Sequence, residues 1–159
     1  TNLKVKPHQR LYFSTFEYEE IYPVFSSVEN QWNMAKLQEV KAGVLIVTGI
    51  VSANELYHYV EEKLGYYEKM RFRDHHRFSK KDIARIARKF NNMTQKYKFI
   101  LVSEKDAARL LSDVAFPENL KPYVYTIPIK VKFLLDQQEM FNKQIMDYVI
   151  KNKRNGRFS

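Results

Sequence analysis

The feature that most constrains the fold is a short apolar run followed by an amphipathic stretch, a pairing that recurs along the chain. The clearest run is VLIVTG at 44–49, which is continuously apolar and ends in glycine. Such a run is typical of a strand buried in a parallel sheet. A helical pattern follows, with Leu56, Val60 and Leu64 on one face and Gly65 at its end.

Further apolar runs continue the alternation. YYEKMRF at 66–72 and KFILVS at 98–103 are the next strand candidates, and a helical pattern follows each of them. YVYTIPIKVKFL at 123–134 predicts one or two strands broken near Pro128, and a last helix is expected over about 135–152. The alternation predicts a Rossmann-like α/β fold, with a mostly parallel sheet and helices on both faces.

Two serines stand where helix caps are expected. Ser52 has Glu55 three residues later, and Ser79 has Asp82 at the same spacing, which is the spacing of a capping box. The helix after Ser79 is predicted to bury Ile83, Ile86, Phe90, Met93 and Tyr97. Its other side carries a basic stripe of Lys81, Arg85, Arg88 and Lys96.

The first part of the chain does not show this alternation. Residues 1–41 are expected to form an interdomain β-ribbon or linker arm, and residues 42–159 the α/β domain. Two β-prone runs, at 11–16 and 21–25, flank a polar stretch and predict a hairpin. The rest of the arm is interpreted as a linker, with a helical stretch around Trp32.

The positive charge is concentrated in one segment. The chain has a net charge of +9, and residues 69–98 contain 11 Lys or Arg against Asp74 and Asp82. Such a segment attracts the phosphates of lipids, nucleotides or nucleic acid, although an ordinary solvated helix face is the alternative. Phe90 and Tyr97 are predicted on the buried side of the helix, which does not favour stacking on bases.

Composition excludes several classes of site. The absence of cysteine excludes disulfides, thiolate zinc sites and cysteine nucleophiles. No apolar run approaches the roughly 20 residues of a membrane span, and the polar start is not a signal peptide. The chain does not begin with Met, so a fragment or a processed product is expected. No G-x-x-x-x-G-K-[ST] occurs in the four-glycine sequence, and the single glycine of TGIVS is not a dinucleotide fingerprint.

Three loops follow the predicted strands at their carboxyl ends, at 48–52, 73–79 and 103–107. In open α/β sheets these ends carry the functional loops, so all three are expected at one edge of the sheet. In the last loop, Glu104, Lys105 and Asp106 start a helix, where backbone N–H groups favour anions. The alternative for these three residues is a solvated first turn.

Asp74-His75-His76 allows three interpretations. A metal site needs three or four ligands, and a DHH-type phosphoesterase needs further aspartates upstream, but residues 1–73 contain none. A structural loop would use the aspartate to cap a turn and pack a histidine beneath it. A histidine beside a carboxylate can also serve acid–base chemistry. The residues by themselves leave these alternatives open.

Three pieces of sequence together resemble one enzyme family. They are TGI at 48–50, F-R-DHH-R-FS at 72–79 and SEKDAARL at 103–110. They are similar to the carboxy-terminal half of tetraacyldisaccharide 4'-kinase, whose pattern is roughly T/C-G-I, F-x-D-H-x-x-[FY]-[ST] and T-E-K-D-A-x-[KR]. The opening segment at 6–25 resembles the interdomain region of the Bacteroidetes branch, so the resemblance covers nearly the whole chain.

The resemblance implies a two-domain enzyme of lipid A biosynthesis. It would transfer the γ-phosphate of ATP to the 4'-hydroxyl of tetraacyldisaccharide 1-phosphate, giving lipid IVA, at the cytoplasmic face of the inner membrane. ATP, Mg²⁺ and the catalytic aspartate would belong to an amino-terminal P-loop domain that this chain lacks. The chain by itself is then expected to bind no cofactor and to be inactive. Its expected partners are that domain, the lipid A precursor and an anionic membrane surface, without nucleic acid.

The resemblance also assigns residues. His75 corresponds to the histidine that faces the catalytic aspartate across the interdomain cleft, and Asp74 is its partner in the same motif. Supporting positions in the cleft are Glu104, Lys105, Asp106 and Thr48; no metal ligand is assigned. Ser103 replaces the usual threonine, and VSANEL replaces the usual turn after TGI. The competing interpretation is a non-enzymatic basic α/β module that binds nucleic acid or anionic lipid.

Overall fold

The computed structural model describes residues 4–7, 9–29, 31–50, 53–113 and 116–154. The chain forms two compact units. The larger unit comprises residues 19–128, and the smaller one comprises residues 1–18 with 129–159. These units do not coincide with the expected segments 1–41 and 42–159, because residues 19–41 group with the sheet.

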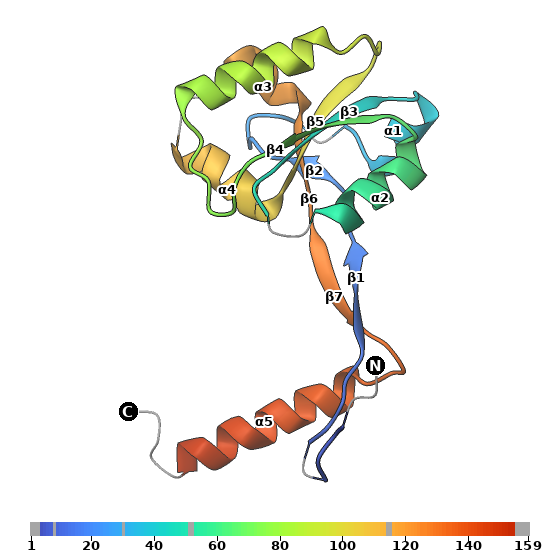
Figure 1. Cartoon of the computed structure of the whole chain (residues 1–159), viewed down its shortest axis with the longest axis vertical. Coiled ribbons are helices and arrows are strands. Elements are labelled where there is room, and N and C mark those ends of the chain that lie inside the picture. Colours follow the sequence, from blue (N-terminus) through green and yellow to red (C-terminus); the bar gives the residue numbers. More distant parts are fainter. Residues whose placement is uncertain (1–3, 8, 30, 51–52, 114–115, 155–159) are drawn as a thin grey trace. The chain divides into compact units, whose positions relative to one another are not determined.

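The larger unit is built on a five-stranded sheet with the order β2-β6-β5-β3-β4 (Figure 1). Four strands are parallel to one another: β3 (Gly43–Thr48), β4 (Tyr67–Arg71), β5 (Lys98–Ser103) and β6 (Val124–Ile127). The short edge strand β2 (Tyr22–Pro23) runs antiparallel to β6. The prediction of a mostly parallel α/β sheet is therefore confirmed.

Helices cover both faces of this sheet. They are α1 (Met34–Glu39), α2 (Asn54–Leu64), α3 (Lys80–Asn92) and α4 (Glu104–Asp113), with a 3₁₀ helix, η1 (Glu118–Tyr123), before β6. The apolar sides of α3 and α4 share one core with alternate side chains of β3 and β5, whereas α1 and α2 contact each other (Figure 1). The apolar run at β3 is buried at every position because it has helices above and below it.

The order of the strands reverses between β3 and β5. The chain passes from β3 to its neighbour β4 on one side and then crosses back to β5 on the other side of β3. In doubly wound sheets, ligands bind at the carboxyl ends of the strands beside such a reversal. The loops after β3 and β5 therefore lie at the position where a site is expected.

The helix α3 begins where it was predicted to begin, but it ends before Tyr97, the last residue of the predicted apolar face. Ser79 accepts a hydrogen bond from the Asp82 backbone N–H, and the Asp82 carboxylate accepts one from the Ser79 backbone N–H, which completes the capping box. The predicted residues from Ile83 to Met93 are buried. The prediction of Tyr97 on the same face was wrong: the helix stops at Asn92, and Tyr97 is 36% exposed.

The smaller unit contains an antiparallel two-stranded ribbon and one helix (Figure 1). Strand β1 (Ser14–Tyr18) pairs with β7 (Ile129–Phe133), and α5 (Gln138–Arg154) follows. Phe141 of α5 packs against Phe133, with ring centres 4.6 Å apart, and against Tyr12 at 5.2 Å.

The predicted hairpin between residues 11–16 and 21–25 was wrong. The partner of β1 is β7, which lies more than a hundred residues later, and Tyr22–Pro23 pairs with β6 instead. Local pattern gives a strand's propensity but not its partner, since pairing depends on which edges the rest of the fold leaves open. Among the described residues, no helix is both long and apolar enough to cross a bilayer.

Candidate functional site at the carboxyl edge of the sheet

The three predicted loops meet at one edge of the sheet, which confirms that prediction. The Gly49 backbone N–H, after β3, donates to Asp106 Oδ2 at 3.0 Å. Lys105 Nζ, at the start of α4, donates to Asp74 Oδ1 in the loop after β4 at 2.8 Å. The predicted cap Ser52 lies outside the described residues; Ala53 precedes α2 and makes no side-chain cap.

Asp106 is the buried centre of this edge. Its side chain is fully buried, and its Oδ2 accepts hydrogen bonds from the Gly49 N–H and from Ser103 Oγ, the latter at 2.8 Å. Its Oδ1 lies 3.3 Å from a guanidinium nitrogen of Arg109. Asp106 is therefore not part of a solvated first turn, because its carboxylate joins the β3 and β5 loops at the point of reversal.

Gly49 makes this bridge possible. A Cβ atom at this position would lie 3.0 Å from the Arg73 carbonyl oxygen and 3.2 Å from Asp106 Oδ1. Both distances are shorter than ordinary contacts, so a side chain would push the two loops apart. The single glycine of the TGI piece thus serves close packing of the loops.

Arg109 was not predicted as a site residue. Its guanidinium lies between the buried Asp106 and the exposed His75, and Nη2 is 3.3 Å from His75 Nδ1. The available signal was its position three residues after Asp106, which places both side chains on one face of α4. Arg109 also corresponds to the last position of the family pattern T-E-K-D-A-x-[KR].

His75 and Asp74 form the solvent-facing end of the network. The His75 side chain is 76% exposed, and its Nε2 lies 3.4 Å from Asp74 Oδ2. Asp74 Oδ1 also accepts from the His75 backbone N–H at 2.9 Å. The hydrogen bond from Lys105 lowers the pKa of Asp74, as do the His75 backbone N–H and the neighbouring charges. Asp74 is thus a carboxylate at neutral pH.

His76 has a different role from its neighbour. Its Nε2 lies 3.0 Å from Asp82 Oδ2, and its ring stacks on Phe72 with centres 4.6 Å apart. Burial raises the pKa of Asp82, but hydrogen bonds from Ser79 and His76 outweigh burial and bring the pKa to about 2. For His76, therefore, the structural-loop interpretation is the correct one, because it supports the start of α3.

Comparison of the sequence with known families shows which proteins it is similar to. The family model of tetraacyldisaccharide-1-P 4'-kinase matches residues 5–150, which is nearly the whole chain. The chain belongs to this 4'-kinase family. The match includes the loops that carry Asp74, His75, Asp106 and Arg109.

Individual relatives agree with the family match. The tetraacyldisaccharide 4'-kinase of Phocaeicola vulgatus is 38% identical over 99% of this chain, and that of Bacteroides thetaiotaomicron is 36% identical over 99%. The chain covers 42% and 43% of the lengths of these two relatives. No solved structure matches the chain.

Thr48 and Glu104, the two remaining residues that the family resemblance assigns, lie outside the His75 network. Thr48 is fully buried, and its Oγ1 has no hydrogen-bond partner among the described residues. Its backbone carbonyl accepts from the Phe72 N–H at 2.7 Å and so fixes the end of β4. Glu104 is exposed and accepts a hydrogen bond from Tyr22 Oη at 3.2 Å; burial and Glu104 both raise the pKa of Tyr22.

The pairing of the carboxylates at this edge does not fit a Mg²⁺ site. Mg²⁺ prefers several oxygen ligands around one point. Asp74 is paired with Lys105, and Asp106 with Arg109 and two further donors. Across the part of the chain that the structure describes, no three His, Asp or Glu side chains gather in a metal-binding group.

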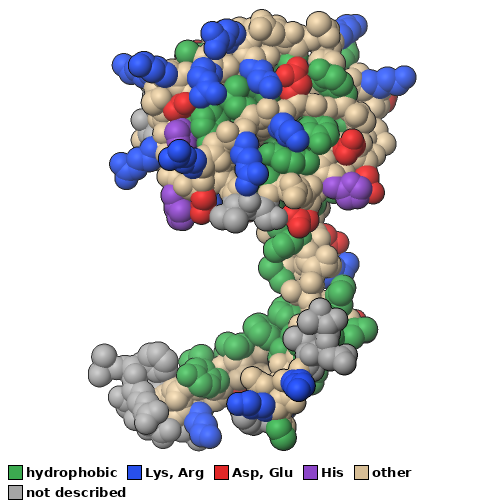
Figure 2. Space-filling model, in the orientation of Figure 1, with side chains coloured by type: hydrophobic (Ala, Val, Ile, Leu, Met, Phe, Trp, Pro, Cys, Tyr) green, Lys and Arg blue, Asp and Glu red, His purple; other side chains and the backbone are tan. Residues whose placement is uncertain are grey.

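Many Lys and Arg side chains lie on one face of the larger unit (Figure 2). We define the cationic groove, a hollow of about 560 Å³ between β4 and α3, by Lys69, Arg71, Arg85, Arg88 and Lys89. The groove also contains Glu68, whose carboxylate lies 3.3 Å from Lys89 Nζ. Arg71 also lines a second hollow, which extends to Asp74, so the groove and the candidate site are adjacent.

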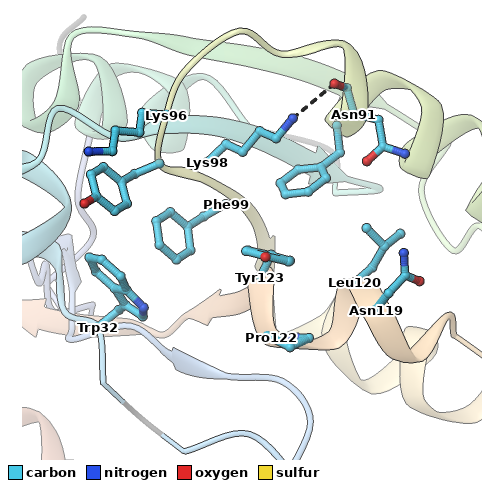
Figure 3. Close-up of a pocket in the computed structure, with 11 residues that line it drawn as sticks. Trp32, Asn91, Lys96, Lys98, Phe99, Asn119, Leu120, Pro122 and Tyr123 are labelled. Atoms are coloured by element: carbon cyan, nitrogen blue, oxygen red, sulfur yellow. Dashed lines mark hydrogen bonds between the residues drawn. The ribbon is translucent and has the colours of Figure 1, made fainter.

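A cavity of about 710 Å³ lies at the other edge of the sheet, where β5 begins (Figure 3). Trp32, Phe99 and Tyr123 line it. Lys98 Nζ, also in its wall, donates to the carbonyl oxygens of Asn91 and Met93, each at 3.1 Å. This cavity contains none of the residues that the family pattern assigns.

Proposed function

We propose that this chain is the carboxy-terminal part of an ATP-dependent 4'-kinase of lipid A biosynthesis. The complete enzyme would transfer the γ-phosphate of ATP to the 4'-hydroxyl of tetraacyldisaccharide 1-phosphate, which gives lipid IVA. Family membership and the names of the relatives support this activity. The chain itself contains no phosphate-binding G-x-x-x-x-G-K-[ST] loop. ATP and Mg²⁺ would therefore be bound by the rest of the enzyme, and this chain alone would not phosphorylate the lipid.

The observation that carries the proposal is the network from Asp106 through Arg109 to His75 and Asp74. Phosphoryl transfer depends mainly on positioning and on compensation of charge. The exposed imidazole of His75, which contacts Arg109 of the Arg109–Asp106 pair, can hydrogen-bond a carboxylate base or exchange a proton with it. We assign His75 as the catalytic residue that faces the aspartate of the other domain, with Asp74 as its partner.

The test compares two histidine variants of the complete protein. His75→Ala is expected to lower kcat by about 10²-fold or more, since acid–base groups contribute factors of this size. The matched control is His58→Ala, which removes an exposed histidine of α2 that is paired with Glu62. Circular dichroism checks the fold of each variant. Full 4'-kinase activity in His75→Ala would refute the assigned role.

The rest of the kinase is the proposed partner of the smaller unit. Large apolar side chains are exposed along β7, α5 and the turn between them, and Figure 2 shows this surface. They include Val131, Leu135, Met140, Ile145, Met146, Tyr148, Val149 and Ile150. Surfaces of this kind are usually covered by another surface. Hydrogen exchange in α5 should be slower in the complete protein than in this chain; equal rates would exclude the contact.

The lipid substrate and the membrane are the other proposed partners. We assign the cationic groove to the phosphates of an anionic bilayer, at the cytoplasmic face where the lipid A precursor would be bound.

The chain should sediment with vesicles of phosphatidylcholine and phosphatidylglycerol, but not of phosphatidylcholine alone, and salt should weaken binding. The double variant Arg85→Glu/Arg88→Glu should lose binding, whereas Lys41→Glu/Lys63→Glu should keep it. Equal losses in both variants would contradict this surface, and tighter binding to a DNA duplex would favour the non-enzymatic alternative.

A further inference from the structure

We propose that Arg109, held by the buried Asp106, positions His75 by fixing which ring nitrogen carries the proton. Arg109 matches a position of the family pattern, but the resemblance assigns no role to it, and the positioning of His75 is that role. Its consequence for catalysis rests on the proposed function, but its structural part concerns this chain alone.

Arg109 is held more rigidly than a surface arginine. Its side chain is 16% exposed, and it pairs with a carboxylate that is fully buried. Asp106 is in turn fixed by the Gly49 N–H and the Ser103 hydroxyl, so the acceptor of Arg109 cannot easily rotate. With Nη1 bound to Asp106 Oδ1, the planar guanidinium directs Nη2 toward His75.

The contact with His75 specifies a tautomer. Arginine has five N–H donors and no acceptor, so the Nη2 contact at 3.3 Å requires that His75 Nδ1 accept. The proton of the neutral ring must then be on Nε2. On the other side of the ring, Nε2 lies 3.4 Å from Asp74 Oδ2, which is an acceptor only. Both neighbours of the imidazole therefore favour the same tautomer.

The backbone of His75 and the side chain of Lys105 support the same orientation of the imidazole ring. His75 has a φ of 57°, in the left-handed region, and its N–H donates to Asp74 Oδ1. Lys105 binds that same carboxylate from α4, at 2.8 Å. The helix α4 thus holds both sides of the histidine, through Arg109 on Nδ1 and through Lys105 and Asp74 on Nε2. With this tautomer, the single N–H of the exposed ring is on Nε2, 3.4 Å from Asp74 Oδ2, and a facing carboxylate base would share this donor with Asp74.

The direct test measures the tautomer in this chain with ¹⁵N-labelled histidine. Long-range ¹H–¹⁵N spectra, recorded at a pH where the rings are neutral, should show His75 protonated on Nε2 only. Arg109→Met should give a mixture of tautomers, whereas the exposed His58 in the same spectrum should not change. Because Arg109→Met leaves the Asp106 carboxylate without a neighbouring cation, Arg109→Lys serves as the second variant. Lysine keeps a positive charge beside Asp106, but it lacks the planar pair of nitrogens that contacts both Asp106 and His75. A single Nε2–H tautomer in either folded variant, or a mixture in the wild type, would overturn the proposal.

The catalytic consequence is read in the complete protein. Arg109→Lys should lower kcat by about tenfold with little change in KM, because the substrate is still bound but the imidazole is not oriented. Combined with His75→Ala, it should cause little further loss, since both changes remove one interaction. A shifted tautomer without a change in kcat would leave the positioning role intact and refute the catalytic assignment of His75. An unshifted tautomer refutes the positioning role whatever the activity.

Discussion

At the scale of single residues, two adjacent histidines have opposite environments. His76 is turned inward, stacks on Phe72 and contacts Asp82, which completes the capping box of α3 with Ser79. His75 is turned outward, and its φ of 57° puts its backbone in a region that costs most L-residues roughly 1–2 kcal/mol. Unfavourable backbone conformations of this kind are concentrated at functional sites, where the surrounding contacts maintain them.

This strain leads to a prediction that separates stability from function. His75→Gly should be more stable than His75→Ala by about 1 kcal/mol, because glycine adopts positive φ without a Cβ clash. Urea unfolding of this chain, monitored by the fluorescence of its only tryptophan, measures the difference. In the complete protein both variants should be equally impaired in kinase activity. Equal stability of the two variants would mean that position 75 is not held in the left-handed region.

At the scale of elements, α4 is the part that assembles the site. It contributes Lys105, Asp106 and Arg109, and it reaches the loops after β3 and β4 as well as its own strand β5. The helix α3 contributes differently, because its capping box and His76 fix the second half of the Asp74 loop. The site thus depends on the first two turns of α4 and on the first turn of α3, which pack on the same face of the sheet.

The cap of α3 predicts a pH dependence of stability. The folded-state pKa of Asp82 is about 2, below the ordinary 3.8, so its ionised form stabilises the fold. This contribution is complete above about pH 4 and is lost as the pH falls from there through 2. The basic side chains that face Asp82 are His76 and Arg85, at 3.0 and 3.6 Å.

Asp82→Asn tests that dependence. The variant should be less stable than the wild type at pH 6 by about 1 kcal/mol, a typical size for a lost helix cap. The difference should shrink between pH 4 and pH 2, because the wild-type carboxylate becomes protonated there. Urea unfolding at several pH values gives the two curves. A difference that is constant over this range would show that the charge of Asp82 contributes nothing to the cap.

At the scale of the whole molecule, the hydrophobic core belongs to one unit. Every buried hydrophobic side chain among the described residues lies between Ile21 and Ile127. The two ends of this unit are adjacent, since the Glu19 N–H donates to the Pro128 carbonyl oxygen at 3.1 Å. In the described part of the smaller unit, a few aromatic contacts stand beside many exposed apolar side chains.

We therefore expect residues 19–128 to fold without the rest of the chain. A protein of these residues should unfold cooperatively in urea with a midpoint close to that of the 159-residue chain. Its amide spectrum should overlay that of the same residues in the longer chain. A large fall in the midpoint would show that the ribbon and α5 stabilise the sheet. Residues 138–154, prepared as a peptide, should be largely unfolded in water, as short isolated helices are.

Local sequence was sufficient for most elements of the larger unit. The apolar run of β3, the amphipathic pattern of α3 and the capping box of Ser79 and Asp82 were all predictable, because each depends on neighbours within a few residues. The meeting of the three loops was also predictable, since parallel strands place their carboxyl ends at one edge. The family pattern supplied His75 and Asp74, which composition and spacing had left open between three interpretations.

Only the tertiary structure decided the long-range choices. It paired β1 with β7 instead of the nearby run at 21–25, turned His76 inward and His75 outward, and buried Asp106 while Glu104 stayed exposed. It also brought Arg109 to His75, across 34 residues of sequence. Local sequence determines which conformations a segment prefers, because those energies come from near neighbours. Which groups finally face each other depends on packing between distant segments, and those energies exist only in the folded chain.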